Sequence, residues 1–471
     1  MKTGPLLEEL INIARISKTD FAISMNMSPS GLSKILTGKR LPLLREKRTF
    51  GKQAANHLAN AIYCDNCRLK FKNIFPVLYD FTSKYELAMF LADAIGYALD
   101  RDFSEENGEN TDYPNRGSSF LGEKTILNMF CVIVSGYAAD GRGIPLEFYS
   151  TLPLFSRLYS EIFHRIKLLG SKAERSVVYN HFFDLSSFEA SYDDHNIDVL
   201  SCIVRAQQYV DLNLWRTAKE IGCSFLLLRG RFLLLFSIQM DGTPLMTFVT
   251  HKGYIATFFN SLMKRDARKI SYNRSEAIAA LEAEPSLADR LIDRKIDAVY
   301  NFISIGYLIK KEELEAVESP GTIRTAVLKL FNSILTKETT FFVTVDAMLG
   351  FCATGKAIVP LIGAIDIEPG KRIPYLKRLD PFIDEKSGDK IRVVNSELPK
   401  AAVLCSRGLS LVYLIDSEYR SEKIHCFETD AINDMLGSEV AESAMKTLDF
   451  TPDLWDSYLE EASRDIRSSA L

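Results

Sequence analysis

The sequence predicts an all-α N-terminal helix-turn-helix domain followed by a larger α/β (α+β) domain, with two similar halves in the latter as one interpretation. Apolar residues recur at helical spacing through the first 72 residues, and residues that favour helix ends separate them. After residue 120, short strand-like runs alternate with helical ones. Within that second region, the stretches SFLLLRGRFLLLFSI and AAVLCSRGLSLVYLI are alike, and each is followed by a strand and a helix.

The composition is that of a globular protein, since 47% of the 471 residues are hydrophobic and 25% are charged. This length gives room for two or three domains. The first 20 residues lack the apolar core of a signal peptide, and the most apolar run, 223–240, is interrupted by Arg229, Gly230 and Arg231. Eight scattered cysteines are typical of reduced thiols. We therefore expect a cytoplasmic protein with no membrane partner.

Positive charge is concentrated at the N-terminal end. Residues 1–72 hold thirteen lysines and arginines but only five aspartates and glutamates, a net charge of +8, whereas the rest of the chain carries −12. A basic segment on an acidic protein suggests a polyanionic partner such as nucleic acid. A solvated basic surface without such a partner is the alternative.

Two helices are predicted before residue 26. The first spans about Pro5–Arg15, and the second follows Ser17, whose hydroxyl can cap a helix that carries Asp20 three residues later. The residues expected to face inward from these two helices are Leu6, Leu7, Leu10, Ile13, Ala14, Phe21, Ala22 and Met25.

A sharp turn and a third helix follow. Asn26 tolerates the left-handed backbone that a tight corner needs, and Met27 is the apolar residue of that corner. Ser28 is a strong N-cap, Pro29 is a favoured first helical residue, and Gly38 ends the helix. Two short helices joined by such a corner form a helix-turn-helix. The expected buried residues of the third helix are Leu32, Ile35 and Leu36.

This pattern resembles the Cro/C1-type (XRE) helix-turn-helix family. The resemblance runs through TDFA at 19–22, MSPSGLSKI at 27–35 and GKRLP at 38–42. The sequence departs from the family at Asn26, where glycine is usual, and at Leu36, where glutamate is frequent. The resemblance covers about the first 65–70 residues and implies nothing about the rest of the chain.

The resemblance implies that this segment binds double-stranded DNA as a homodimer and that its third helix enters the major groove. Lys34 is then the candidate for reading a guanine edge, while Ser30 and Ser33 are short and discriminate little. A helix-turn-helix that serves only protein contact is the alternative. The expected DNA-binding residues are Pro29, Ser30, Ser33 and Lys34 in the groove, Lys18 and Ser28 at phosphates, and Thr37, Lys39 and Arg40 at the strand beyond.

We expect the helix-turn-helix domain to occupy residues 1–72, and a helical connector with an acidic linker to occupy 73–119. Apolar positions of the connector helix, expected over 73–100, could form a dimer seam. The basic segment Leu43–Lys52 either adds phosphate contacts or is a solvated loop, and a helix over 53–63 follows it. The remaining domains are two α/β sensor or effector halves, 120–300 and 301–471, the second of which ends in C-terminal helices.

The two stretches of the second region each turn at an Arg-Gly pair, Arg229-Gly230 and Arg407-Gly408. Duplication of one unit explains the likeness, and shared hairpin chemistry is the other explanation. The helices expected in this region span 125–138, 152–168, 199–222, 253–266, 275–281, 288–306 and 322–335. The expected strands span 225–228, 232–239, 245–250, 340–345, 391–394, 402–405, 409–415 and 423–428.

No motif argues for a catalytic residue, a cofactor or a metal. The segment GFCATGK at 350–356 matches the start of a phosphate-binding loop, but Ala357 replaces the hydroxyl that would bind Mg²⁺, and Pro360 interrupts the helix that should follow. Cys64 and Cys67 form a CxxC without a second pair of ligands. Asp193-Asp194-His195 is suggestive only in composition, and no G-x-S-x-G occurs.

The sequence therefore favours a bacterial or phage-like transcriptional regulator whose acidic second region dimerises, senses an effector, or both. A small molecule, a peptide or a partner protein could be that effector. An enzyme or effector protein whose helix-turn-helix serves targeting or autoregulation is the alternative. A purely structural interaction protein is the third hypothesis.

Overall fold

The computed structural model of the chain divides into two compact units. The first comprises Met1–Asp184, Tyr209–Leu212 and Thr217–Ala267, and the second comprises Leu185–Gln208, Asn213–Arg216 and Arg268–Leu471. The structure describes residues 2–64, 67–78, 80–106, 118–139, 145–153, 157–170, 176–183, 203–204, 206–218, 221–284, 286, 289, 293–301, 303–336, 338–383, 390–394, 401–416, 421–430, 432–434, 436, 448–449 and 451–469. In these ranges no helix combines the length and apolar character that a membrane span requires.

Helices form the described part of the chain as far as residue 106. The residues expected to face inward before residue 37 are buried, except that Ile13 and Ala14 are half-buried. The elements are α1 (Thr3–Ala14), α2 (Lys18–Ser24), α3 (Pro29–Leu36), the 3-10 turn η1 (Leu44–Glu46), α4 (Lys47–Ile62), α5 (Arg68–Phe71) and α6 (Lys84–Glu106).

The connector differs from its predicted form. The sequence predicts a helix over 73–100, but α6 begins at Lys84. Residues 72–78 form turns instead, because Pro76 has no backbone N–H to donate and disfavours a helical residue before it. Three of the apolar side chains that suggested a longer helix, Phe75, Phe81 and Phe90, pack with Phe71 of α5 as a cluster of rings.

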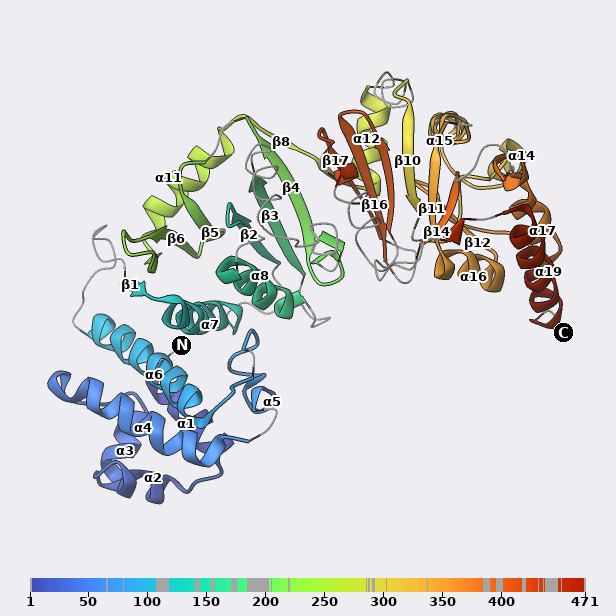
Figure 1. The fold of residues 1–471 in the computed structure, drawn as a ribbon. Coiled ribbons are helices and arrows are strands. Elements are labelled where there is room, and N and C mark those ends of the chain that lie inside the picture. Colours follow the sequence, from blue (N-terminus) through green and yellow to red (C-terminus); the bar gives the residue numbers. More distant parts are fainter. Residues whose placement is uncertain are drawn as a thin grey trace. The chain divides into compact units, whose positions relative to one another are not determined.

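Helix α6 takes part in two interiors of the first unit. It packs on α1 and α4, and it also lies along α7 (Glu123–Ala139), as Figure 1 shows. Asn128 of α7 donates a hydrogen bond of 3.0 Å to the Asp93 carboxylate of α6. The ring of Tyr97 on α6 lies 6.2 Å from that of Phe248 on a strand of the first sheet. The helical segment and the first sheet therefore belong to one compact unit.

The first sheet has its strands in the order β1-β7-β6-β5-β2-β3-β4-β8. β2 and β3 are parallel and are connected through α8 (Arg157–Gly170), while β5, β6 and β7 form an antiparallel meander. Gly230, with φ of 67°, makes the β5–β6 turn. The strands are β1 (Ser118–Leu121), β2 (Leu146–Ser150), β3 (Val177–Phe183), β4 (Asp211–Thr217), β5 (Ser224–Leu228), β6 (Phe232–Ile238), β7 (Pro244–Val249) and β8 (Ala267–Lys269), and α11 (Lys252–Met263) follows β7.

The second sheet has the order β18-β14-β11-β10-β15-β16-β17-β9. Its strands are β9 (Ser271–Asn273), β10 (Ile296–Asn301), β11 (Thr340–Thr344), β14 (Ile391–Val394), β15 (Ala401–Ser406), β16 (Leu409–Ile415), β17 (Glu422–Phe427) and β18 (Leu448–Asp449). A separate hairpin consists of β12 (Lys356–Val359) and β13 (Gly363–Asp366). The accompanying helices are α12 (Arg274–Ala283), α14 (Lys311–Glu315), α15 (Gly321–Ile334), α16 (Val345–Thr354), α17 (Pro369–Leu376), the 3-10 helix η2 (Lys377–Phe382) and α19 (Pro452–Ser469).

The two sheets share one topology. Read from β9, the order of the second sheet is β9-β17-β16-β15-β10-β11-β14-β18. Each strand of the first sheet then has a counterpart at the same position, from β1 with β9 to β8 with β18. The counterparts also follow one another along the chain in the same order as the strands of the first sheet. The parallel pair β2–β3 corresponds to β10–β11, and the meander β5-β6-β7 corresponds to β15-β16-β17. The hairpin β12–β13 has no counterpart among the described residues of the first sheet. This topology supports the interpretation of two similar halves.

The second pattern begins at Ser271, and the two compact units meet in the sequence between Ala267 and Arg268. The sequence places the boundary between halves later, between residues 300 and 301, which is inside β10. The likeness of the two hairpins indicates that there are two halves. It does not indicate where each half begins, because the hairpins lie well after those starting points in the sequence.

Two predicted helices are wrong. The sequence predicts helices over 199–222 and 288–306, yet β4 and β10 lie within these ranges. β10, IDAVYN, is buried along most of its length, and a buried strand shows no polar face to distinguish it from a helix. The strands β2 and β3 were not predicted, for the same reason. The eight predicted strands are confirmed, within one residue at either end, as β5, β6, β7, β11, β14, β15, β16 and β17.

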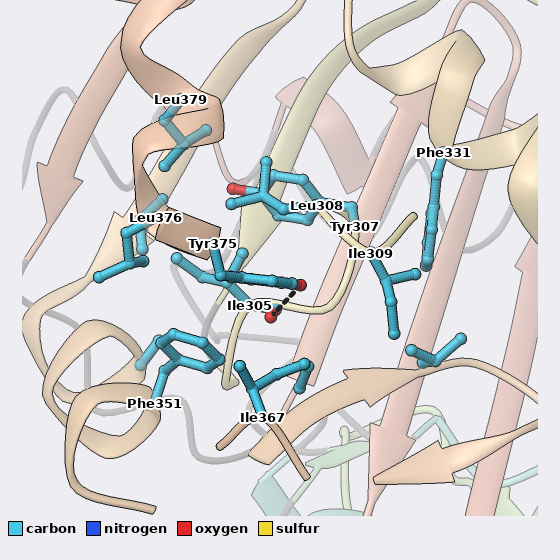
Figure 2. Packing of buried hydrophobic residues seen from close by; sticks show 14 of the residues in the cluster. Ile305, Tyr307, Leu308, Ile309, Phe331, Phe351, Ile367, Tyr375, Leu376 and Leu379 are labelled. Atoms are coloured by element: carbon cyan, nitrogen blue, oxygen red, sulfur yellow. Dashed lines mark hydrogen bonds between the residues drawn. The ribbon is translucent and has the colours of Figure 1, made fainter. Parts of the chain in front are cut away.

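The interior of the second unit is organised around α17. Tyr375 of this helix is fully buried, stacks on Phe351 at 4.9 Å between ring centroids, and donates a hydrogen bond of 3.0 Å to the carbonyl of Ile305, which Figure 2 shows. The next residue, Gly306, lies against the backbone of Ile358 in β12. The inserted hairpin is thus packed directly on the segment that follows β10.

A buried carboxylate lies beside the same hairpin. Glu422 of β17 is 1% exposed at its side chain and accepts the backbone N–H of Leu361 at 2.9 Å. Its other oxygen, Oε1, is buried without a hydrogen bond and lies 4.0 Å from Nη1 of Arg274. Arg274 itself donates to the carbonyls of Leu361 and Ile362. Burial raises the pKa of Glu422, because the charged form is poorly solvated there.

Replacing Glu422 with glutamine is expected to stabilise the second unit at pH 7 by about 1–3 kcal/mol, because the uncharged amide avoids the cost of desolvating a buried carboxylate. Since the pKa of Glu422 is higher in the folded protein, the ionised side chain opposes folding above that pKa. The gain from glutamine should therefore shrink as the pH falls towards the unfolded value of about 4.3. Thermal unfolding at the two pH values measures this. Glu338→Gln, at an exposed carboxylate paired with Lys295, is the control, and equal midpoints for E422Q and wild type at pH 7 would contradict the expectation.

Candidate nucleic-acid interface

The ends of α2 and α3 are formed by the residues predicted for them. Ser17 Oγ accepts the backbone N–H of Asp20 at 3.0 Å, and Ser28 Oγ accepts that of Gly31 at 3.1 Å. Between the two helices Asn26 adopts a left-handed conformation with φ of 54°, and Gly38 after α3 has φ of 67°. These predictions are confirmed: Asn26 and the two caps define the turn between α2 and α3, and Gly38 follows the end of α3.

Helix α3 is held from below by α1. Its residues Leu32, Ile35 and Leu36 are buried. Gly4 of α1 lies so close to α3 that a Cβ added to it would be 2.3 Å from the carbonyl oxygen of Leu36. The backbone of α1 therefore packs directly on the backbone of α3. This contact holds the inner side of α3 in place, while its outer side is exposed to solvent.

All of the residues predicted to contact DNA are exposed. They lie at the start of α2, along the outer side of α3 and in the segment that follows it. The structure thus brings the predicted set together on neighbouring elements of one helical segment. The set consists of Lys18, Ser28, Pro29, Ser30, Ser33, Lys34, Thr37, Lys39 and Arg40.

Three of these side chains already have intramolecular partners. Ser28 Oγ serves as the cap of α3, and Thr37 Oγ1 donates to the carbonyl of Ser33 at 2.8 Å. Lys18 Nζ forms an ion pair of 2.5 Å with Glu8 Oε1. In contrast, Lys34, Lys39 and Arg40 make no ion pair with another described residue. Those three are the positive charges of the set that are not neutralised within the protein.

The basic segment Leu43–Lys52 is mostly helical. η1 occupies residues 44–46 and α4 begins at Lys47, six residues before the predicted start, because Phe50 and Gly51 join the buried side of the helix. Lys47 is directed inwards: it forms an ion pair with Asp100, and burial lowers its pKa. Arg45, Arg48 and Lys52 are exposed. Arg45 forms an ion pair of 3.5 Å with Glu46, so among the described residues Arg48 and Lys52 are the exposed cations of this segment without an ion pair.

A small hollow opens beside α3. Its volume is about 110 Å³. It is lined from α1 and α2 by the two members of the ion pair, Glu8 and Lys18. A second set of residues lines it from α3 and from the residue that follows α3. That set is Pro29, Leu32, Ser33, Leu36 and Thr37.

The segments considered as phosphate-binding or metal-binding motifs do not have the geometry of such sites in the part of the chain that the structure describes. Gly350 lies inside α16 and Lys356 in β12, so GFCATGK spans a helix end rather than a loop between strand and helix. Cys67 is buried and Cys64 exposed. Among the described residues, no three histidine, cysteine, aspartate or glutamate side chains are arranged to hold a metal ion. Asp193-Asp194-His195 lies outside the described residues.

One pair has the chemistry of a nucleophile and its base, and no sequence motif predicts it. Ser271 Oγ and His425 Nδ1 are 2.6 Å apart. Both residues are fully buried, and burial lowers the pKa of His425 to about 3. A substrate cannot reach this pair, so it stabilises the junction of β9 and β17 rather than forming an active site.

Comparison with known proteins identifies no family: no family model and no curated protein matches the chain. Among solved structures, the chain is similar to that described as "Structure of TrmBL2, an archaeal chromatin protein, shows a novel mode of DNA binding". The identity is 10%, the match covers 45% of this chain and 82% of that chain, and the TM-score is 0.21. A likeness at this level carries no argument about function.

Glu8 is the residue of this surface that sequence reasoning missed. It lies on α1, ten positions before Lys18, and no helical or strand spacing relates the two. Their contact arises from the way α1 crosses the start of α2, which only the tertiary structure shows.

Proposed function

We propose that this protein is a sequence-specific DNA-binding regulator of transcription, in which α2 and α3 form a helix-turn-helix and α3 enters the major groove. The observation that carries the proposal is the uncompensated positive surface on and after α3, formed by Lys34, Lys39 and Arg40, on a helix whose backbone is fixed by α1. An exposed helix with short side chains at its start and a lysine further along fits the groove and can contact base edges.

The proposal includes a homodimer. A helix-turn-helix protein commonly binds two half-sites about one helical turn of DNA apart, ~34–36 Å, and the two copies supply the two recognition helices. The α/β halves would then hold the copies together, bind a small-molecule or peptide effector, or do both. Effector binding would act by changing the population of the DNA-competent arrangement.

Fluorescence anisotropy of the full chain with its own upstream DNA and with a scrambled duplex, at two salt concentrations, tests the proposal. Selective binding that weakens with salt is the expected result. Weak and equal binding to both duplexes would contradict it. That outcome would favour the alternative, an enzyme or effector protein for which the helical segment serves targeting.

Lys34→Ala is expected to lower the preference for the upstream DNA by about tenfold, since one bidentate base contact is worth ~1–3 kcal/mol. Lys39→Ala should instead weaken binding to both duplexes and reduce the salt slope by about 0.9, the value for one lost phosphate contact. Competition titrations with the two duplexes separate these effects. Unchanged selectivity in K34A would show that Lys34 does not read a base.

A further inference from the structure

The ion pair between Glu8 and Lys18 occupies the surface assigned above to DNA. Lys18 is the first residue of α2, and its Nζ lies 2.5 Å from Oε1 of Glu8 on α1. The Lys18 side chain is 56% exposed and that of Glu8 is 46% exposed, so solvent and solutes reach both groups. An ion pair with this exposure is weak, and another anion can displace the carboxylate.

The Glu8–Lys18 ion pair lies next to α3, in the candidate interface. Both side chains line the hollow of about 110 Å³, whose other wall is formed by α3, including Ser33, and by Thr37 directly after it. About 10–15 Å³ of such space suffices for one water molecule, so the hollow admits several waters or one group of phosphate size. A DNA strand that passes along α3 would therefore bring a phosphate to the place where the Glu8 carboxylate already binds Lys18.

We infer that Glu8 is an internal competitor for the phosphate contact of Lys18 and so weakens the binding of every DNA sequence alike. This inference rests on the proposed function. In the free protein Glu8 takes the place of the phosphate at the lysine. In the complex, the contact of Lys18 with the phosphate replaces the ion pair, so the loss of that pair offsets part of the new contact. Glu8 thereby restrains non-specific binding and leaves selectivity to residues that reach the bases.

The test uses the full chain and a matched pair of variants, Glu8→Gln and Glu9→Gln. Glu9 is the adjacent residue of α1 and is exposed, does not line the hollow, and gives the same change in net charge. Glu8→Gln is expected to bind both the upstream and the scrambled duplex about three- to tenfold more tightly at low salt, whereas Glu9→Gln should change affinity much less. The salt slope of Glu8→Gln should also become steeper, by up to about 0.9.

The same substitution in a Lys18→Gln background shows whether the effect passes through the lysine. There, Glu8→Gln should have no larger effect than Glu9→Gln, because no phosphate contact remains for which the carboxylate can compete. Glu8→Ala repeats the measurement with a residue that favours helix, and circular dichroism checks that α1 is intact.

Two results would overturn the inference in distinguishable ways. If the wild type binds its upstream DNA selectively but Glu8→Gln behaves like Glu9→Gln, the proposed function stands and Glu8 is not a competitor. If the wild type shows no selective binding, the proposed function fails and the role of Glu8 fails with it.

Discussion

Replacing Gly306 with alanine is expected to destabilise the second unit by about 4 kcal/mol or more, which is at the upper end for a single substitution. A Cβ at this position would lie 1.6 Å from the carbonyl oxygen of Ile358 and 2.4 Å from its carbonyl carbon. Both are backbone atoms, so no side chain can rotate away. The strand β12 would have to leave its place on the segment after β10.

Such a displacement removes other contacts as well. Ile358 packs with Ile303, Tyr413 and Ile415, and the turn after β12 receives the hydrogen bond from Arg274 and gives one to Glu422. Urea unfolding followed by hydrogen exchange over residues 356–366 would measure the loss. Gly370→Ala is the matched control, because an added Cβ there meets no atom within 4 Å. A midpoint for G306A equal to that of G370A would show that β12 does not need this close approach.

Gly4→Ala is expected to destabilise the helical segment by about 2–4 kcal/mol and to lower DNA affinity by at least tenfold. The added Cβ would lie 2.3 Å from the carbonyl oxygen of Leu36 and 2.9 Å from its carbonyl carbon, so α1 and α3 must separate. Because α3 is the proposed recognition helix, its displacement changes both its angle and its distance from the groove.

Thermal unfolding and anisotropy measured on the same sample test this prediction. Gly96→Ala, in α6 of the same unit, is the control, since an added Cβ there meets no atom within 4 Å. If G4A lost stability but bound the upstream DNA as tightly as G96A, the interface would have to lie elsewhere than on α3.

Local chemistry explains which parts of the fold could be predicted. The caps at Ser17 and Ser28 and the left-handed Asn26 depend on side chains within three residues of the backbone they satisfy, so the sequence reveals them. In each meander the first two strands are joined by an Arg-Gly turn, which marks the register of that pair.

The parts that were missed depend on long-range contacts. The strands β2 and β10 lie between two neighbours in their sheets and are buried on both faces, so their apolar runs resemble buried helices. The close approach of Gly306 to Ile358 joins residues 52 positions apart, and nothing near either residue in the sequence indicates it. The candidate site was predictable as a set of exposed residues, but its ion pair with Glu8 was not, because the pair joins two separate helices.

Helix α6 has a further consequence for how this sequence can change over time. Its residues contribute to the interior beneath α1 and α4, and other residues of the same helix meet α7 and β7. A substitution on α6 must therefore be compatible with the packing of two interiors. A side chain that fits one interior can clash or leave a cavity in the other. The exposed residues of α3 do not have to fit two interiors in this way. Substitutions on the exposed side of α3 are therefore expected to disturb the fold less than substitutions on α6.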